Sequence, residues 1–464
     1  MHFTPGESGS SLFHAALTTA LETHADVFRG VTIPKRGKPF KAGLAEAIVR
    51  FEARRAGSEQ RVDIARTLVD ALMAHARFGP SGEPLQQSLV EGPAEPQVLA
   101  STGKVGWVPE VHYRGESWRG NGIRGLALRM REDHQLTTPA YRALRWVADN
   151  LLTEPLDLRG HTFAILGAGA ELAPTPYLLQ AGARVLWVDR RPPDGPPPAG
   201  ELVTYPGADD LLADPCAIYQ AVAAEAARGP LHLGLFAYAP GKGRELLLTT
   251  AMNAIAARLP DESLRSVSML VSPTTPGELS EDDKRDQVAR AAAAKRWHRG
   301  LTRLRVLPQT ASHRDGDAEI ARSIVSLQGP TYLAAQYLAK MMLSEAWAVD
   351  RSMRISANVA GITHTKSLEH PLFLAGFVGA PRFGVEVFEP DQTRVLTTLL
   401  MLHDALNPDA PCADASGGAA AQGRRVASQA IHGGVRSLPW EFWGTIQSAA
   451  VLGMVSKPSV LFRR

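Results

Sequence analysis

Cysteine and long apolar runs are almost missing from this sequence. Cys216 and Cys412 are the two cysteines among 464 residues. They can build neither a disulfide framework nor a cysteine-based zinc site, which favours a reducing compartment. No run of roughly 18 apolar residues occurs, so we expect no membrane insertion. The first residues, MHFTPGESGSS, lack the basic start and apolar stretch of a secretory signal, and we therefore expect a cytoplasmic protein.

An excess of one charge is also missing. Lys and Arg number 50 against 47 for Asp and Glu, a net charge of +3, so nucleic acid is not an expected partner. Hydrophobic residues make up 45% of the chain and charged residues 21%, which excludes disorder as the main state. The chain is about three times the ~150 residues typical of one domain, so we expect two or three domains.

Several catalytic motifs are absent as well. The 14 histidines include no His-Glu-x-x-His and no cluster with ligand spacing, so we expect no metal site. Neither a Gly-x-Ser-x-Gly turn nor a Gly-x-x-x-x-Gly-Lys-Ser/Thr loop occurs. The sequence thus argues against nucleophile-elbow hydrolases and phosphate-loop NTPases.

Hydrophobic periodicity divides the chain into parts. Residues 1–80 carry apolar residues at three- and four-residue spacing in three segments, which predicts helices. An irregular glycine-rich stretch follows, and a further predicted helix, 138–152, ends before Pro155. The predicted parts are a mainly helical N-terminal extension of unknown role at 1–154, a domain at 155–437 with an inserted segment at about 278–318, and a helical tail at 438–464.

Short β-rich runs alternate with helical segments after residue 155. These runs are apolar nearly throughout, which is typical of parallel strands covered by helices on both faces. The sequence therefore predicts an α/β fold with a doubly wound parallel sheet of the Rossmann kind. The predicted strands are 161–166, 184–188, 201–204, 231–238, 267–271 and 353–359.

A nucleotide-binding motif follows the first of these strands. Gly167 and Gly169 form a Gly-x-Gly turn, a helix is expected to begin near Glu171, and the next strand ends on Asp189. The glycines permit a tight turn close to a pyrophosphate, the helix N-terminus faces its charge, and the acid accepts from a ribose hydroxyl. The alternative is a tight βα turn with no ligand. The predicted cofactor contacts here are Gly167, Gly169, Ala170, Glu171, Leu172, Asp189 and Arg190.

The choice between the two nicotinamide cofactors depends on the end of the second strand. Asp189 favours NAD, because a carboxylate repels the 2′-phosphate of NADP. Arg190 and Arg191 follow directly and could receive that phosphate. We therefore expect NAD and leave NADP open.

Further landmarks resemble the short-chain dehydrogenase/reductase family over roughly residues 155–437. They are the turn Ala237-Tyr238-Ala239-Pro240-Gly241 after the fourth strand, Asp210-Leu211 after the third, Ser272 after the fifth, the helix GPTYLAAQYLAKMM, the turn Ala360-Gly361 with Thr365, and SQAIHGGVRS in place of a closing strand. The resemblance implies an NAD(P)-binding Rossmann fold and a homo-oligomer. It adds Asp210, Leu211, Ala237, Tyr238, Ala239, Gly361 and Thr365 to the expected cofactor contacts.

The same resemblance implies a catalytic set. Tyr332 would exchange a proton with a carbonyl or alcohol oxygen, and Ser272 would orient that oxygen. The family's lysine, which lowers the tyrosine pKa and holds the nicotinamide ribose, is replaced by Gln336. A glutamine can bond the ribose but supplies no charge. Tyr332 is equally consistent with a tyrosine packed under the sheet, and Ser272 with a serine that opens a loop.

These observations favour an NAD(P)-dependent oxidoreductase that transfers a hydride to or from a small-molecule carbonyl or alcohol. The extension and the insertion suggest a lid over a bulky acyl or polyketide-like substrate. Two alternatives stay open. One is a dinucleotide-binding regulator or scaffold without turnover, and the other is a non-redox lyase or isomerase that retains NAD.

Overall fold

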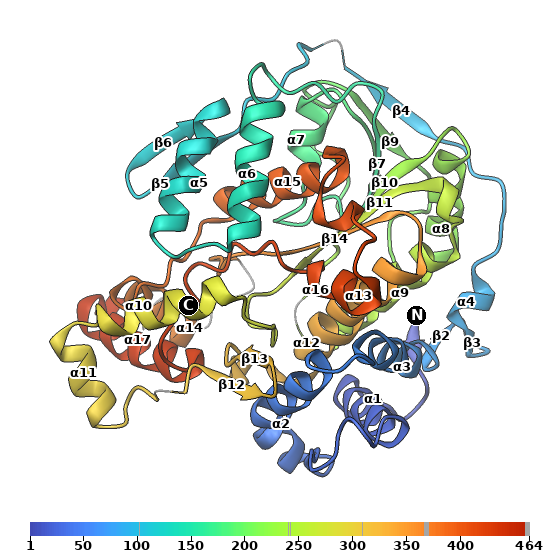
Figure 1. Ribbon diagram of the computed structural model, residues 1–464. Coiled ribbons are helices and arrows are strands. Elements are labelled where there is room, and N and C mark those ends of the chain that lie inside the picture. The colour runs from blue at the N-terminus through green and yellow to red at the C-terminus, as the bar shows by residue number, and fades with distance from the viewer. Residues whose placement is uncertain (102, 240, 242, 309, 366–370, 460–464) are drawn as a thin grey trace.

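A seven-stranded sheet forms the centre of the computed structural model, which describes residues 1–464 except 102, 240, 242, 309, 366–370 and 460–464 (Figure 1). Its strand order is β14-β11-β10-β7-β8-β9-β4, parallel throughout except for the antiparallel edge strand β4. Strand β4 comes first in the chain and lies at one edge; the parallel part starts in the middle at β7, continues outward to β9 beside β4, and then returns to add β10, β11 and β14 on the other side. This order confirms the predicted mixed α/β fold and is compatible with a Rossmann-like arrangement. The strands are β4 (Gln97–Ala100), β7 (Thr162–Leu166), β8 (Arg184–Val188), β9 (Glu201–Thr204), β10 (Leu231–Leu235), β11 (Leu264–Val271) and β14 (Arg354–Val359).

Both faces of the sheet are buried because its strands are apolar on both sides. In β7, Ala164 and Leu166 enter one core, and Phe163 and Ile165 enter the other. The first core includes α8 (Pro215–Ala226), α9 (Arg244–Arg258) and α13 (Leu343–Asp350). The second includes α5 (Ile123–Glu132), α6 (Thr138–Asn150), α7 (Thr175–Gln180) and α15 (Pro390–Leu406).

The predicted boundary at residue 155 does not separate two packed units. Strand β4 extends the sheet, and α5 and α6 cover one of its faces. A smaller helical core lies before β4, where the helices α1 (Gly9–Thr23), α2 (Lys38–Ala56) and α3 (Arg61–Met73) pack on α12 (Gly329–Gln336) and the π-helix η4 (Tyr337–Met342).

A buried ionic cluster joins this helical core to α13. Arg55 of α2 has no exposed side-chain surface, and its guanidinium donates to Glu52 and to Glu345 at 2.7–3.0 Å. Arg61 of α3 also donates to Glu345, and the Tyr337 hydroxyl donates to Glu52. Since each charge has an opposite partner, the cluster is compatible with burial.

The inserted segment, a helix that follows β14 in the chain and the C-terminal tail form a peripheral lobe. It contains α10 (Glu281–Ala292), α11 (Arg296–Arg303), α14 (Pro371–Gly379) and α17 (Phe442–Ser456), which lie together at one side of the molecule (Figure 1). Helices α14 and α17 approach so closely that a Cβ at Gly379 would lie 1.9 Å from the Ala449 carbonyl oxygen. The predicted closing strand at 428–437 is reduced to one parallel bridge, Val359 with Ala430.

Within the described residues, no helix has the length and apolarity needed to cross a bilayer.

The remaining elements are short. The short strands and helices are β1 (His2–Phe3), β2 (Ala76–Phe78), β3 (Glu83–Pro84), α4 (Leu85–Ser88), β5 (Glu110–Tyr113), β6 (Glu116–Arg119), β12 (Ser312–Asp315), β13 (Ala318–Ala321) and α16 (Gly418–Arg425).

Candidate active site

The candidate site lies at the carboxyl edge of the sheet. Gly167, Ala237 and Ser272 directly follow or closely follow the ends of β7, β10 and β11, which are parallel neighbours. Carboxyl ends of parallel strands meet at one edge, and ligands of doubly wound sheets bind there. The order of strands therefore gathers the residues that the sequence motifs singled out.

Ser272 and Tyr332 meet, although 60 positions separate them in the sequence. The Ser272 side chain lies within hydrogen-bonding reach of the Tyr332 hydroxyl. Ser272 ends up there because β11 stops just before Pro273, and Tyr332 because α12 begins at Gly329 and Pro330. The pairing favours the catalytic interpretation of these two residues over independent packing roles.

Tyr332 remains protonated at neutral pH. Burial is the largest influence and raises the pKa of the Tyr332 phenol above its usual value, while the Ser272 hydrogen bond lowers it. The Glu245 carboxylate and the Tyr238 phenol raise it further. A cation beside the phenol would have the opposite effect. Tyr332 is therefore suited to donate a proton and unsuited to act as a resting phenolate base.

Gln336 is hydrogen-bonded within the protein. Its Oε1 accepts from the Ser272 backbone N–H at 3.0 Å, and its Nε2 donates to the Glu245 carboxylate at 3.3 Å. The side chain is buried, and both of its polar ends are used inside the protein. Gln336 thus positions the loop after β11, and each end of its buried amide already has a partner inside the protein.

Glu245 and Lys340 complete this buried network, and the sequence analysis missed both in these roles. Glu245 is the second residue of α9, and its carboxylate lies 3.6 Å from the Lys340 ammonium. Burial raises the pKa of Glu245, and Lys340 and the Ala239 N–H oppose that shift. The π-helix η4 places Lys340 here, because its wider turn alters the α-helical register after Gln336.

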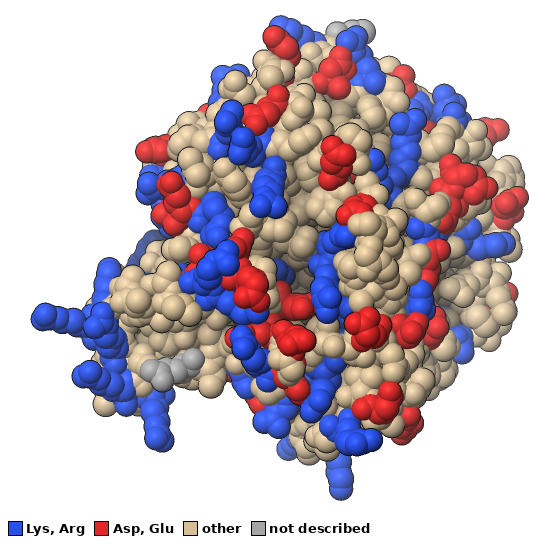
Figure 2. All heavy atoms as spheres, viewed as in Figure 1, with Lys and Arg blue, Asp and Glu red and all other residues tan. Residues whose placement is uncertain are grey.

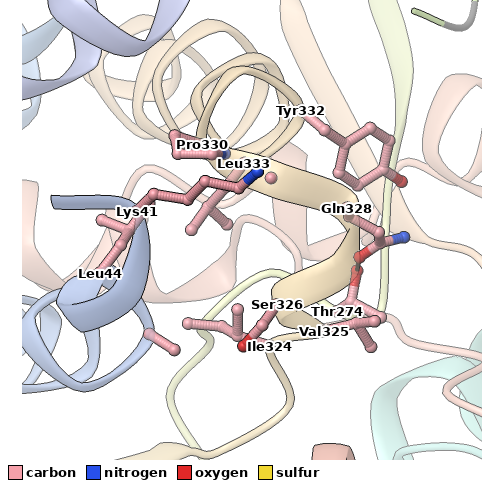
Figure 3. A pocket seen from close by; sticks show the side chains of 12 residues that line it. Lys41, Leu44, Thr274, Ile324, Val325, Ser326, Gln328, Pro330, Tyr332 and Leu333 are labelled. Carbon is pink, nitrogen blue, oxygen red and sulfur yellow. Dashed lines mark hydrogen bonds between the residues drawn. The ribbon is translucent and has the colours of Figure 1, made fainter. Parts of the chain in front are cut away.

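A narrow crevice lies beside Tyr332. Its cavity volume is about 20 Å³, room for about one water molecule. Thr274 donates to the Gln328 side chain at 2.8 Å and shares a hydrogen bond of 2.8 Å with Ser272. Figure 3 shows Tyr332, Gln328 and Thr274 on one side and Lys41, from α2, on the other. The N-terminal helices therefore contribute to the wall next to the candidate catalytic pair.

Gly167 stands at the closest approach of two strand ends. Its φ is +90°, and a Cβ there would lie 2.2 Å from the Ala237 backbone nitrogen. Only glycine permits both this conformation and this contact. The same close approach holds the Gly-x-Gly turn against the segment Ala237–Ala239.

Substitution of Gly167 by Ala should lower the free energy of unfolding by about 2–4 kcal/mol, because the methyl group adds a backbone clash to the positive φ. Urea unfolding followed by circular dichroism measures the effect. Gly160→Ala is the matched control, since Gly160 has a φ of +83° and open space around its Cβ position. It should cost about 1 kcal/mol. Equal losses in both variants would contradict the clash.

The turn after β7 differs from the predicted dinucleotide motif in one respect. Helix α7 begins at Thr175 rather than near Glu171 and has six residues. Pro174 precedes it and Pro176 lies in its first turn, which explains the late start, since proline cannot donate a helical hydrogen bond. Residues Glu171 and Leu172 lie in a turn, and Arg394 of α15 donates to the Glu171 carbonyl at 2.8 Å. No helix N-terminus therefore faces a pyrophosphate at these two residues.

Asp189 lies where the motif requires it. Its carboxylate accepts from the Gly169 N–H at 3.1 Å and from the Arg191 N–H at 2.9 Å. The neighbouring Ala170 N–H donates to the Gly167 carbonyl at 3.0 Å. A ribose at the end of β8 could meet the free lone pairs of Asp189, and exposed Arg190 follows it. These residues fit the adenosine half of a dinucleotide better than its pyrophosphate.

Several other predicted cofactor contacts have local structural roles. The Asp210 carboxylate accepts from the Leu212 and Ala213 N–H groups, and Leu211 is buried in a core. A Cβ at Gly361 would lie 2.4 Å from the Phe388 ring, so this glycine permits close packing. The structure therefore offers no support for an adenine contact at Asp210 or a cofactor contact at Gly361.

Four predicted residues lie near the carboxyl edge of the sheet. Tyr238 is partly exposed and is close enough to Tyr332 to influence its pKa. The Ala239 N–H donates to Glu245 at 3.4 Å, and Ala237 contacts the Gly167 turn. Thr365 lies in the loop after β14, with its N–H on the Thr363 carbonyl. Strands β10 and β14 thus carry these residues to the same edge of the sheet as Ser272.

Comparison with known proteins provides no identification. No protein-family model matches this chain, and no curated protein is significantly similar to it.

Proposed function

We propose that this protein is an NAD(P)-dependent oxidoreductase of the short-chain dehydrogenase/reductase type that reduces a carbonyl group. The observation that carries the proposal is the contact between Ser272 and Tyr332 at the carboxyl edge of the sheet. Ser272 and Tyr332 were each predicted from their positions in the sequence. Because they are far apart in the chain, only the fold can bring them together. A serine and a protonated tyrosine beside each other can supply two hydrogen-bond donors to one oxygen once the Ser272 hydroxyl turns away from Thr274.

The roles of the chain's residues follow from their contacts. Ser272 would hydrogen-bond the carbonyl oxygen, and Tyr332 would donate the proton that this oxygen needs on reduction. Gln336 fixes the loop that carries Ser272, and Glu245 with Lys340 holds Gln336. The raised pKa of Tyr332 supports the reductive direction, because the phenol is protonated at the start of each turnover.

Asp189 and the Gly167–Gly169 turn would hold the adenosine half of a nicotinamide cofactor, and Tyr238 and Thr365, which follow β10 and β14, would face its other half. When bound, the cofactor supplies the hydride. Asp189 favours NAD, and Arg190 leaves NADP open. Lys41 and Leu44 of α2 line the crevice beside Tyr332, which supports a substrate enclosed by the N-terminal helices.

Titration of NADH and NADPH, followed by nicotinamide fluorescence, tests the cofactor assignment. We expect saturable binding of at least one of them, and at least a tenfold loss of affinity in Gly169→Asp. A Cβ at Gly169 lies 3.2 Å from the Asp189 carboxyl, so the new carboxylate would repel both Asp189 and a phosphate. Gly160→Asp is the matched control, remote from that carboxyl. Absence of binding to either nucleotide would overturn the proposal.

One observation favours a second candidate, a dinucleotide-binding regulator without turnover. The turn after β7 uses the Gly169 and Ala170 N–H groups internally, and α7 starts late. Such a site could hold a cofactor without orienting it for hydride transfer. Binding of NADH with no oxidation in the presence of a panel of aldehydes, ketones and acyl thioesters would support this candidate.

A further inference from the structure

The peripheral lobe carries a basic and apolar surface that the proposed reaction does not use. No acidic residue occurs between Asp286 and Asp315, whereas this stretch contains seven Lys and Arg residues. Figure 2 shows Lys and Arg gathered on the lobe at the lower left, in an area with little Asp or Glu in view. A charge of one sign therefore accumulates here, although the whole chain is close to neutral.

Helix α11 and the turn after it separate an inner side from an outer side. His298 is buried, and its ring lies 5.0 Å from Trp440 and 5.4 Å from Phe383. Thr302 accepts from the Trp440 indole N–H at 3.1 Å. These contacts fix the inner side of α11 on the lobe and leave its other side facing solvent.

The outer side combines arginines with large apolar side chains. Arg296, Arg303 and Arg305 are exposed, and within the described parts of the chain no carboxylate forms an ion pair with them. The exposed fractions are 39% for Trp297, 74% for Leu304 and 48% for Val306.

A surface that combines exposed apolar side chains with unpaired arginines is stabilised by a partner that is both apolar and negatively charged. Exposed leucine, valine and tryptophan side chains gain free energy when they leave water, and unpaired arginines gain it beside negative charge. A basic amphipathic segment with tryptophan and leucine is the pattern of helices that lie in a bilayer interface. Two valines of α17 in the same lobe are also exposed, Val451 at 57% and Val455 at 75%.

We propose that the outer side of α11 and the turn to Val306 bind the surface of an anionic phospholipid bilayer. The arginines attract the lipid phosphates, and Leu304 and Val306 enter the headgroup layer beside the exposed part of Trp297, whose ring also packs on Phe383 at 5.4 Å between centroids. The association is peripheral and reversible, and it leaves the sheet and the candidate active site outside the bilayer.

Co-sedimentation of the full chain with vesicles tests this proposal. We expect binding to an equimolar mixture of phosphatidylglycerol and phosphatidylcholine, weak or no binding to phosphatidylcholine alone, and release by high salt. The triple variant Arg296→Gln/Arg303→Gln/Arg305→Gln should lower the partition coefficient ~100-fold, from the loss of three interfacial charges. Leu304→Ser should lower it ~10-fold through the lost apolar contact.

The matched control uses another exposed basic cluster. Lys35, Arg36 and Lys38 lie in and beside the loop before α2, and no large apolar side chain there is among the exposed ones. Lys35→Gln/Arg36→Gln/Lys38→Gln removes the same charge and should leave vesicle binding within about twofold of the wild type. Absence of binding to the anionic vesicles would overturn the proposal. Equal losses in the two triple variants, or no effect of Leu304→Ser, would also overturn it, because binding would then be general electrostatic adsorption. All variants are checked by circular dichroism for an unchanged fold.

Discussion

Replacement of Tyr332 by Phe should lower the turnover number for carbonyl reduction by ~10²–10⁴-fold, the usual contribution of a positioned general acid. The substitution removes one oxygen atom and keeps the ring, so α12 retains its packing. Binding of the nicotinamide cofactor should stay within about twofold, because the phenol is assigned to the substrate oxygen. Single-turnover oxidation of NADH at saturating substrate measures the chemical step directly.

The pH dependence adds an independent readout. Burial and Glu245 raise the pKa of Tyr332, so its acid form persists across the neutral and mildly alkaline range. The wild-type rate of reduction should therefore show no decline from tyrosine ionisation below pH ~10. Tyr141→Phe, the same change on α6, is the control and should leave turnover unchanged. Turnover of Tyr332→Phe equal to that of the wild type would remove the tyrosine from the mechanism.

Replacement of Arg55 by Met should lower the free energy of unfolding by about 3–5 kcal/mol at neutral pH. Arg55 is fully buried and is the shared partner of Glu52 and Glu345. Its loss leaves two buried carboxylates with Arg61 as the remaining arginine bonded to Glu345. Urea unfolding followed by circular dichroism measures the difference.

The loss should shrink as the pH falls. Burial opposes ionisation of Glu345, but Arg55 and Arg61 lower its pKa to about 2. This depressed pKa stabilises the wild type fully above the unfolded value of ~4.3, and the contribution is lost as the pH falls toward 2. In the variant, Glu345 keeps Arg61 but loses Arg55, so its pKa is depressed less. The variant's disadvantage should therefore be smaller at pH ~4 than at pH 7.

Arg66→Met is the matched control on the neighbouring helix α3. Arg66 pairs with Asp63 and Asp350, but its side chain is 36% exposed. Surface pairs contribute about 0–1 kcal/mol, so the loss should be correspondingly small and should weaken in high salt. Equal effects of the two substitutions would show that the buried cluster has no special weight.

Most strands of the sheet could be predicted because each corresponds to a short apolar run in the sequence. A run such as the one around Phe163–Leu166 is apolar on both faces, and a short run of this kind is typical of a strand buried in a parallel sheet. Strand β4 gave no such signal, since all four of its residues are exposed, including Val98 and Leu99. Its pairing with β9 depends on an edge that exists only in the folded sheet. Prediction from sequence therefore missed it.

The candidate site also contains residues that the sequence predicted and residues that it did not. The order of landmarks predicted that Ser272 and Tyr332 would serve one site, and their contact agrees with it. Glu245 gave no distinct signal, because an acid in the first turn of a helix is common for electrostatic reasons alone. The position of Lys340 depends on the π-helical register of η4, and no local sequence motif predicted that register. The predicted helix start near Glu171 was wrong, because Pro174 and Pro176 move the start of α7 to Thr175.

The antiparallel edge strand β4 also constrains how the chain can fold as it is synthesised. Residues Gln97–Ala100 find their partner only after Glu201–Thr204 has left the ribosome. Helix α6 can complete its packing only after α15 at 390–406 has been synthesised, and Arg55 can form its ion pair only after Glu345 has been synthesised. The N-terminal third therefore remains without its final contacts during most of translation, and a nascent chain of this protein has to be kept from aggregation until nearly complete.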